Sequence, residues 1–118
     1  MHILLVEDEC ITRESARLSL EDRGYTVTAV ENGKRAIEAL CAHPCDLVLM
    51  DIKMPVMDGM EAARKIRSEL TCGTAIPIIA LTAYNSRDFD DYRAAGFTDW
   101  IEKPYNSNDL VRKIRELT

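Results

Sequence analysis

Three acidic residues, a threonine and a lysine stand at or just after the ends of short apolar runs in the sequence. They are Glu7, Asp8, Asp51, Thr82 and Lys103. If the ends of these runs meet, two ionised carboxylates about 4 Å apart repel by about 4 kcal/mol at an effective dielectric constant of about 20. Such a cluster requires a compensating cation. An oxygen-only ligand set at a wet site suits Mg²⁺, and the lysine supplies a second, fixed positive charge.

A carboxylate, a divalent cation, an ammonium group and a hydroxyl together are the groups that phosphoryl transfer uses. Asp51 would be the nucleophile and would become an aspartyl phosphate, while Mg²⁺ and Lys103 neutralise charge on the phosphoryl oxygens. Taken alone, each residue is also explained as a helix cap or a solvated charge. Their shared position at the ends of apolar runs favours a joint site.

The elements that must position these residues are short apolar runs that alternate with amphipathic segments. Strands are predicted over 3–6, 25–29, 46–50, 76–81 and 98–101, and helices over 11–22, 34–41, 59–70, 86–95 and 108–117. The second and fifth strands are more polar than the others and are predicted to lie at the edges of a sheet. Asp58, Ser86 and Ser107 are predicted to cap helices at their N-termini.

Five strand–helix units of this length predict an α/β fold of the (βα)₅ type, a doubly wound three-layer sandwich. Its central parallel sheet is expected to have five strands in the order 2-1-3-4-5, as in flavodoxin-like proteins. In such sheets ligands bind beyond the carboxyl ends of the strands, where the strand order reverses. The acidic residues are therefore expected to converge there.

The composition indicates a single domain over residues 1–118 and excludes several classes of partner. The net charge of −5 opposes direct binding to nucleic acid. No apolar run is long enough to span a membrane, and no basic segment precedes the first run. We therefore expect a cytoplasmic protein that binds neither nucleic acid nor membrane.

The same residues resemble a known family. Glu7-Asp8, the segment 51–59 (D-I-K-M-P-V-M-D-G), Thr82-Ala83 and Lys103-Pro104 occur in the order found in the receiver domain of two-component response regulators. The chain resembles receiver domains of the chemotaxis-regulator type, and the resemblance covers its whole length. It implies a phosphoprotein that takes part in phosphorelay signal transduction.

The resemblance also implies roles for individual residues. Asp51 is the implied phosphoacceptor, and the implied Mg²⁺ ligands are Asp8, Asp51 and the main-chain carbonyl of Lys53, with Mn²⁺ as a substitute ion. Glu7 is expected to act on the metal mainly through bound water. The peptide bond that precedes Pro104 is expected to be cis.

A conformational switch follows from the resemblance as well. Thr82 is expected to bind a phosphoryl oxygen after phosphorylation, and Trp100, which stands where the family usually has tyrosine or phenylalanine, is expected to move inward. The fourth helix, fifth strand and fifth helix would form the output surface. Lys53 and Tyr84 flank the site, and we expect them to screen the acyl phosphate and lengthen its lifetime.

The resulting hypothesis is a phosphoacceptor switch rather than an enzyme, with self-phosphorylation from small donors and self-dephosphorylation as its only reactions. Its partners would be a histidine kinase or a histidine phosphotransfer protein, and a downstream target or tethered output domain. We expect a monomer or a weak, phosphorylation-dependent dimer.

Three alternatives remain beside this hypothesis. The chain could be the receiver domain of a hybrid sensor histidine kinase and act as a relay station. A phosphatase with an aspartate nucleophile is disfavoured, because Lys53 occupies the position where that class needs a second aspartate. A flavodoxin-like cofactor carrier is disfavoured, because the acidic segment 7–9 would repel the cofactor phosphate.

Overall fold

The computed structural model describes residues 1–52, 57–69, 76–82, 89–103 and 105–117. Strands and helices alternate along these residues, as predicted. Their bounds are β1 His2–Val6, α1 Cys10–Asp22, β2 Thr26–Val30, α2 Gly33–Ala42, β3 Leu47–Asp51, α3 Gly59–Glu69, β4 Ile78–Thr82, α4 Phe89–Ala95, β5 Asp99–Glu102 and α5 Ser107–Leu117. In this described part of the chain, no helix is long and apolar enough to cross a membrane.

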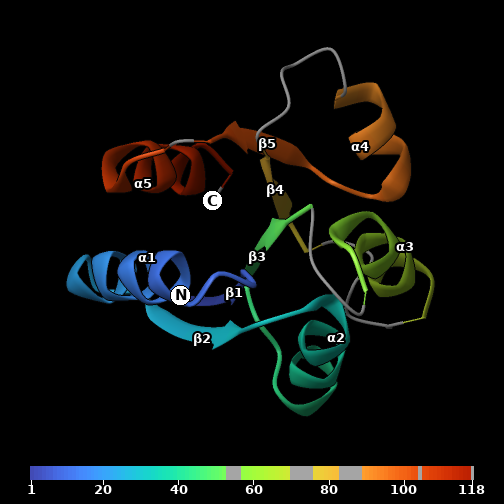
Figure 1. The fold of residues 1–118 in the computed structure, drawn as a ribbon, viewed down its shortest axis with the longest axis horizontal. Helices are drawn as coiled ribbons and strands as arrows, with labels where there is room; N and C mark the ends of the chain where they lie inside the picture. The colour runs from blue at the N-terminus through green and yellow to red at the C-terminus, as the bar shows by residue number, and fades with distance from the viewer. Residues whose placement is uncertain (53–56, 70–75, 83–88, 104, 118) are drawn as a thin grey trace.

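The strands form one parallel sheet in the order β2-β1-β3-β4-β5. Helices α1 and α5 cover one face of this sheet, and α2, α3 and α4 cover the other (Figure 1). This arrangement confirms the predicted doubly wound three-layer fold. It also confirms that β2 and β5 are the edge strands, where their more polar side chains meet water on one side.

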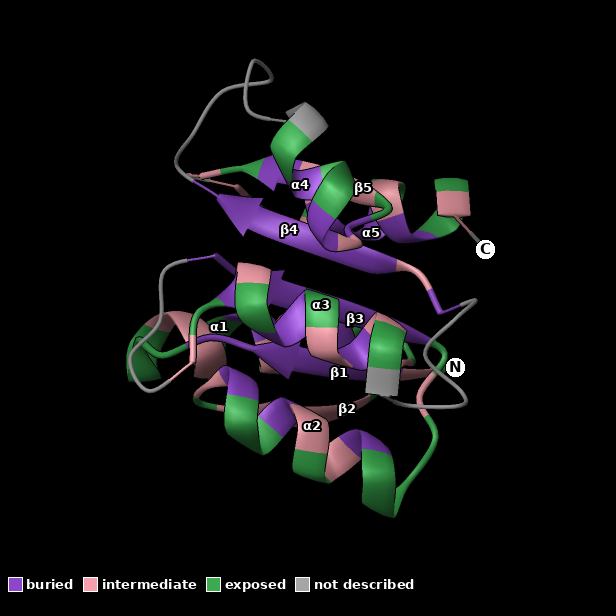
Figure 2. Ribbon diagram, turned by 90° about the vertical axis from the view of Figure 1, so that its right-hand side faces the viewer, coloured by how far each residue is buried: buried purple, intermediate pink, exposed green. Residues whose placement is uncertain are grey.

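Two apolar cores lie on the two faces of the sheet, because successive side chains of a strand point to opposite faces. One core packs the sheet against α1 and α5, and the other packs it against α2, α3 and α4. Figure 2 shows that the three central strands are buried, and only His2, the first residue of β1, is partly exposed. Continuous apolar runs are what strands covered on both faces require.

The same alternation decides which way the two strand-end residues face. Asp51 ends β3 and continues the positions of Leu47 and Leu49, which face α1 and α5. Thr82 ends β4 and continues the positions of Ile78 and Ala80, which face the opposite helices. Asp51 and Thr82 therefore lie at the same end of neighbouring strands but on opposite faces of the sheet.

One of the predicted helix caps is wrong. Ser107 is the first residue of α5, and the preceding residue, Asn106, caps the helix. The Asn106 side chain accepts a hydrogen bond from the Asp109 N–H at 2.9 Å, while the Asp109 carboxylate accepts one from the Asn106 N–H at 3.3 Å. This reciprocal pair satisfies two N–H groups, which a serine at 107 alone would not do. Asp58 caps α3 as predicted, through the Glu61 N–H at 2.9 Å, and Ser86 lies outside the described residues.

Candidate functional site

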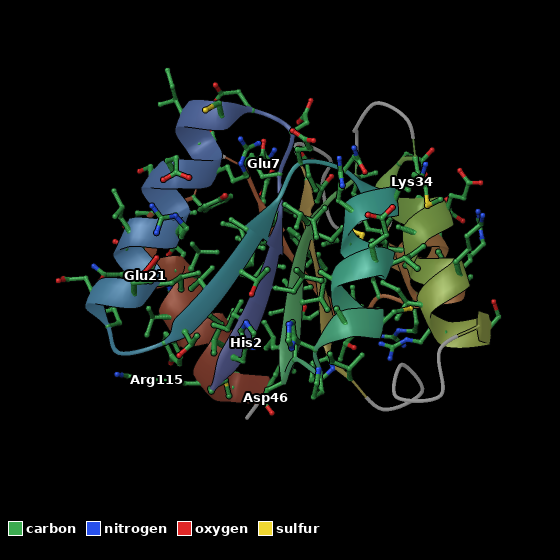
Figure 3. The ribbon with its side chains drawn as sticks, turned by 90° about the horizontal axis from the view of Figure 1, so that it is seen from below. His2, Glu7, Glu21, Lys34, Asp46 and Arg115 are labelled. Carbon is green, nitrogen blue, oxygen red and sulfur yellow. The ribbon has the colours of Figure 1, made fainter. Side chains whose placement is uncertain are left out.

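Three carboxylates meet at the carboxyl ends of β1 and β3. One oxygen from each of Glu7, Asp8 and Asp51 lies within 4.8 Å of the others. Figure 3 shows Glu7 at one end of the sheet, with His2 and Asp46 at the other. Glu7 and Asp51 are only 2% and 6% exposed, whereas Asp8 is exposed to solvent. Two of the three carboxylates thus lie where water compensates their charge poorly.

Lys103 provides the positive charge that these carboxylates require. It follows β5, and its Nζ lies 2.9 Å from Asp51 Oδ2 and 3.3 Å from Glu7 Oε2. Partial burial alone would lower the pKa of Lys103, but the hydrogen bond and charge of Asp51, together with those of Glu7, outweigh this effect and raise it. Lys103 therefore carries a fixed positive charge at the centre of the site.

Glu7 is the group in the site whose ionisation is most strongly disfavoured. Burial raises the pKa of Glu7 from 4.5 to about 7, and the negative charge of Asp51 adds to the shift, while Lys103 opposes it. Near neutral pH the Glu7 side chain is therefore still partly protonated in the metal-free protein. A further cation at this point would favour the charged form of Glu7 and so lower its pKa.

The loop after β1 is held by contacts that the sequence did not indicate. The Arg13 guanidinium of α1 donates to the backbone carbonyl of Glu7 at 2.9 Å. Glu9 caps α1 by accepting hydrogen bonds from the Ile11 and Thr12 N–H groups at 3.1 and 2.6 Å. These contacts fix the backbone that carries the Glu7 and Asp8 carboxylates.

Gly59 brings the start of α3 into contact with the backbone of Asp51. A Cβ atom at position 59 would lie 2.2 Å from the Asp51 carbonyl oxygen and 2.9 Å from the Ile52 Cα. The Gly59 N–H also donates to the Ile52 carbonyl at 2.8 Å. Only glycine allows this approach, so the glycine that ends the segment 51–59 positions the backbone of Asp51.

Gly59→Ala is expected to lower the free energy of unfolding by about 2–4 kcal/mol, because the added methyl group meets backbone that cannot move away cheaply. Urea unfolding of the purified variant measures this loss. Gly24→Ala is the matched control, since position 24 has open space but a φ of +94°, and it should cost about 1 kcal/mol. Equal losses in the two variants would contradict the assigned role of Gly59.

Thr82 and Trp100 lie on the other face of the sheet from the carboxylates. Thr82 is 1% exposed, and its hydroxyl lies 3.1 Å from the hydroxyl of Tyr92 in α4. Trp100 is half-buried in β5 and packs against the core on this face. Tyr92 is a residue that sequence reasoning missed, because nothing in the sequence pairs a hydroxyl in β4 with one ten residues later.

Three of the predicted site residues lie outside the described part of the chain. These are Lys53, Tyr84 and Pro104. Their predicted parts in metal binding, lifetime and a cis peptide stay predictions. Among the described residues, Glu7, Asp8, Asp51 and Lys103 form one cluster, and Thr82 ends the neighbouring strand.

Comparisons with known proteins point to one family. The family model "Response regulator receiver domain" matches residues 3–115. The chain is 38% identical to the transcriptional regulatory protein CseB of Streptomyces avermitilis over 115 residues, which are 97% of this chain and 47% of CseB. It spans about half the length of several other curated relatives as well, among them response regulators named MprA from mycobacteria.

Solved structures of similar shape agree with this family. The chemotaxis response regulator CheY4 of Vibrio cholerae has a TM-score of 0.93 and 28% identity, over 99% of this chain and 98% of CheY4. The receiver domain of the sensor histidine kinase PA1611 of Pseudomonas aeruginosa has a TM-score of 0.89 and 36% identity, over 98% of this chain and 95% of that domain. That structure holds a magnesium ion in its active-site cleft.

Proposed function

Because this chain belongs to the response regulator receiver domain family, we propose that it is a phosphoacceptor switch whose acceptor is Asp51. The observation that carries this proposal is the contact of the Asp51 carboxylate with Lys103 Nζ at 2.9 Å, inside a cluster with Glu7 and Asp8. A nucleophilic carboxylate beside a fixed cation is the arrangement that phosphoryl transfer requires. The donor is the phosphohistidine of a histidine kinase or of a histidine phosphotransfer protein.

The reaction transfers one phosphoryl group between two side chains. An Asp51 carboxylate oxygen attacks phosphorus, the bond from phosphorus to the donor's imidazole nitrogen breaks, and its electron pair stays on the imidazole. Asp51 becomes an acyl phosphate. Lys103 stays within reach of the new phosphoryl oxygens and neutralises part of the charge that they bring.

The carboxylates also fit a divalent metal ion. Glu7, Asp8 and Asp51 offer oxygen ligands within 4.8 Å of one another, which suits Mg²⁺ or Mn²⁺. When bound, the ion supplies charge neutralisation at the phosphoryl oxygens. The carbonyl of Lys53, which lies outside the described residues, would be a further ligand. Asp8 and Asp51 would bind directly and Glu7 mainly through water.

Incubation with acetyl phosphate and Mg²⁺, followed by intact-mass measurement, tests the proposal. We expect the mass to rise by one phosphoryl group. Hydroxylamine, which attacks the acyl carbon of an acyl phosphate and releases phosphate, should replace this gain with the smaller one of a hydroxamate on Asp51. The only reactions that we expect the domain to catalyse are its own phosphorylation and the hydrolysis of its own acyl phosphate. A chain that stays unlabelled by acetyl phosphate and by phosphorylated histidine kinases would refute the proposal.

The stability of the metal-free protein is expected to fall as the pH rises from about 4.5 to about 7. Over this range the unfolded chain releases the Glu7 proton while the folded chain, with its raised pKa, retains it, so deprotonation favours unfolding. Millimolar Mg²⁺ should raise the melting temperature at pH 8 and flatten this dependence.

Glu7→Gln is the variant that isolates this effect, because the amide cannot ionise. At pH 8 without Mg²⁺ we expect it to be more stable than the wild type by about 1–2 kcal/mol, and at pH 4 to show no such gain. Urea unfolding at both pH values measures the difference. A gain that is independent of pH would disprove the role of Glu7 ionisation.

The output surface proposed for this switch is formed by α4, β5 and α5. A groove of about 600 Å³ lies over β5 and α5 and is lined by charges of both signs and by Trp100. Since Trp100 also packs against the core beneath α4, its inward movement would change this groove. A downstream protein or a tethered output domain would bind there.

The context of the domain follows from the same proposal. Residues 1–118 would form one receiver domain of a cytoplasmic signalling protein, either a monomer or a weak phosphorylation-dependent dimer, without direct contact to nucleic acid or membrane. A relay station within a hybrid sensor kinase is the second candidate, supported by the 36% identity to the receiver domain of the kinase PA1611.

A further inference from the structure

A buried hydrogen bond connects the end of β4 to helix α4. The hydroxyls of Thr82 and Tyr92 lie 3.1 Å apart, and the two residues are 1% and 4% exposed. The Tyr92 ring packs edge-on against Phe97 with ring centres 6.2 Å apart. Both rings belong to the core against which Trp100 packs. Tyr92 therefore joins the strand-end hydroxyl to the aromatic residues beside the output surface.

The contact with Tyr92 matters because Thr82 points away from the face of the sheet on which Asp51 lies. Strand alternation directs Asp51 towards α1 and α5, whereas Thr82 faces α4 and is held there by Tyr92. To donate a hydrogen bond to a phosphoryl group on Asp51, the Thr82 hydroxyl must turn towards the rim of the sheet. It cannot keep its present geometry with Tyr92 while it does so.

We propose that Tyr92 is a positioning residue that holds the Thr82 hydroxyl on the α4 side of the sheet until Asp51 is phosphorylated. The proposal rests on the phosphoacceptor function argued above. When Thr82 turns to the phosphoryl group, the buried Tyr92 hydroxyl loses one partner, which is unfavourable in a water-free environment. Tyr92 then shifts within the aromatic core, and the Trp100 side of the core repacks.

Arg67 holds the C-terminal end of α4 in place, and this limits how Tyr92 can move. The Arg67 guanidinium of α3 donates to the Gly96 carbonyl at 2.9 Å and to the Thr98 hydroxyl at 3.2 Å. Gly96 follows α4 with a φ of +118°, and its Cα approaches Arg67 so closely that a Cβ would lie 2.7 Å from Arg67 Cγ. Movement that begins at Tyr92 is therefore taken up by the ring contacts and not by sliding of the whole helix.

Tyr92→Phe removes the competing hydroxyl and keeps the ring. Because the Thr82 contact opposes the phosphorylated arrangement, the variant should bind beryllofluoride, an acyl phosphate analogue, with Mg²⁺ roughly threefold to tenfold more tightly than the wild type. The sole tryptophan, Trp100, reports binding through its fluorescence. Thermal melting should show a folded variant with a similar transition.

Two further variants separate a positioning role from a structural one. In a Thr82→Ala background, Tyr92→Phe should no longer change beryllofluoride affinity, because the contact is already absent. Tyr25→Phe is the matched control, since Tyr25 is half-buried against the core on the opposite face, and it should leave the affinity unchanged.

The outcomes distinguish this inference from the proposed function. If the wild type binds beryllofluoride and Tyr92→Phe binds it equally or more weakly, the role of Tyr92 is wrong while the phosphoacceptor function stands. An increase in affinity that persists in the Thr82→Ala background would also overturn the role of Tyr92. If the wild type binds no beryllofluoride and accepts no phosphoryl group, both proposals fail.

Discussion

Asp51→Asn is expected to abolish phosphorylation, with no mass increase under conditions that label the wild type completely. The amide nitrogen and oxygen of asparagine lack the negative charge that makes a carboxylate nucleophilic. The neighbouring acids are not expected to replace it, because Lys103 Nζ lies closer to the Asp51 carboxylate, at 2.9 Å, than to that of Glu7, at 3.3 Å. Loss of the Asp51 charge should also stabilise the metal-free fold, since it relieves the repulsion of Glu7.

Asp46→Asn is a control at the other end of β3, the strand that ends with Asp51. Asp46 precedes β3 at the opposite end of the sheet, where its carboxylate accepts a hydrogen bond from the His2 N–H at 2.8 Å. This variant should be phosphorylated at the rate of the wild type. If Asp51→Asn is labelled to the same extent as the wild type, the phosphoacceptor lies elsewhere, and peptide mapping of the labelled protein would locate it.

Lys103→Met should give the second large effect, a fall in the phosphorylation rate of about 10²–10³-fold. The methionine keeps much of the apolar volume but removes the ammonium group that contacts Asp51 and Glu7, and with it the charge that stabilises the transferring phosphoryl group. The metal-free protein should lose about 1–3 kcal/mol of stability, because two nearly buried carboxylates lose their common counterion. Stopped-flow fluorescence of Trp100 with acetyl phosphate measures the rate.

Lys113→Met is a closely matched control for this variant. Lys113 also bridges two acids, Asp99 at 3.1 Å and Glu116 at 3.5 Å, and its side chain is 27% exposed against 28% for Lys103. Its removal should cost less than about 1 kcal/mol, as for other ion pairs near the surface, and should leave the phosphorylation rate unchanged. A similar rate loss in both variants would show that net charge, and not the position of Lys103, controls the reaction.

The arrangement of the elements could be predicted because it depends on local patterns. Continuous apolar runs marked the buried strands, and the more polar runs marked the edges. The positions of Asp51 and Thr82 at strand ends followed directly, since parallel strands expose their carboxyl ends at one edge. The cap of α5 failed by one residue, because Asn106 and Ser107 are both good capping residues and only the partner Asp109 decides between them.

The contacts that tune the site could not be predicted, because they join residues that no periodicity relates. Arg13 reaches back to the carbonyl of Glu7, and Tyr92 reaches across to Thr82. The sequence identifies Gly59 only as part of a motif. Its close approach to the backbone of Asp51 could not be predicted, because it depends on how α3 packs against β3. Each of these contacts exists only once the backbone is folded.

The opposite orientation of Asp51 and Thr82 has a consequence for how such a domain can diversify. The Asp51 side chain lies on the face covered by α1 and α5, whereas Thr82 and Tyr92 lie on the face covered by α2, α3 and α4. Substitutions in the core around Tyr92 are therefore expected to change how the output surface responds while they leave the carboxylate cluster intact. Thr82 is the residue that connects the two faces in the proposed switch, because it ends the strand beside Asp51 and contacts Tyr92 on the α4 side.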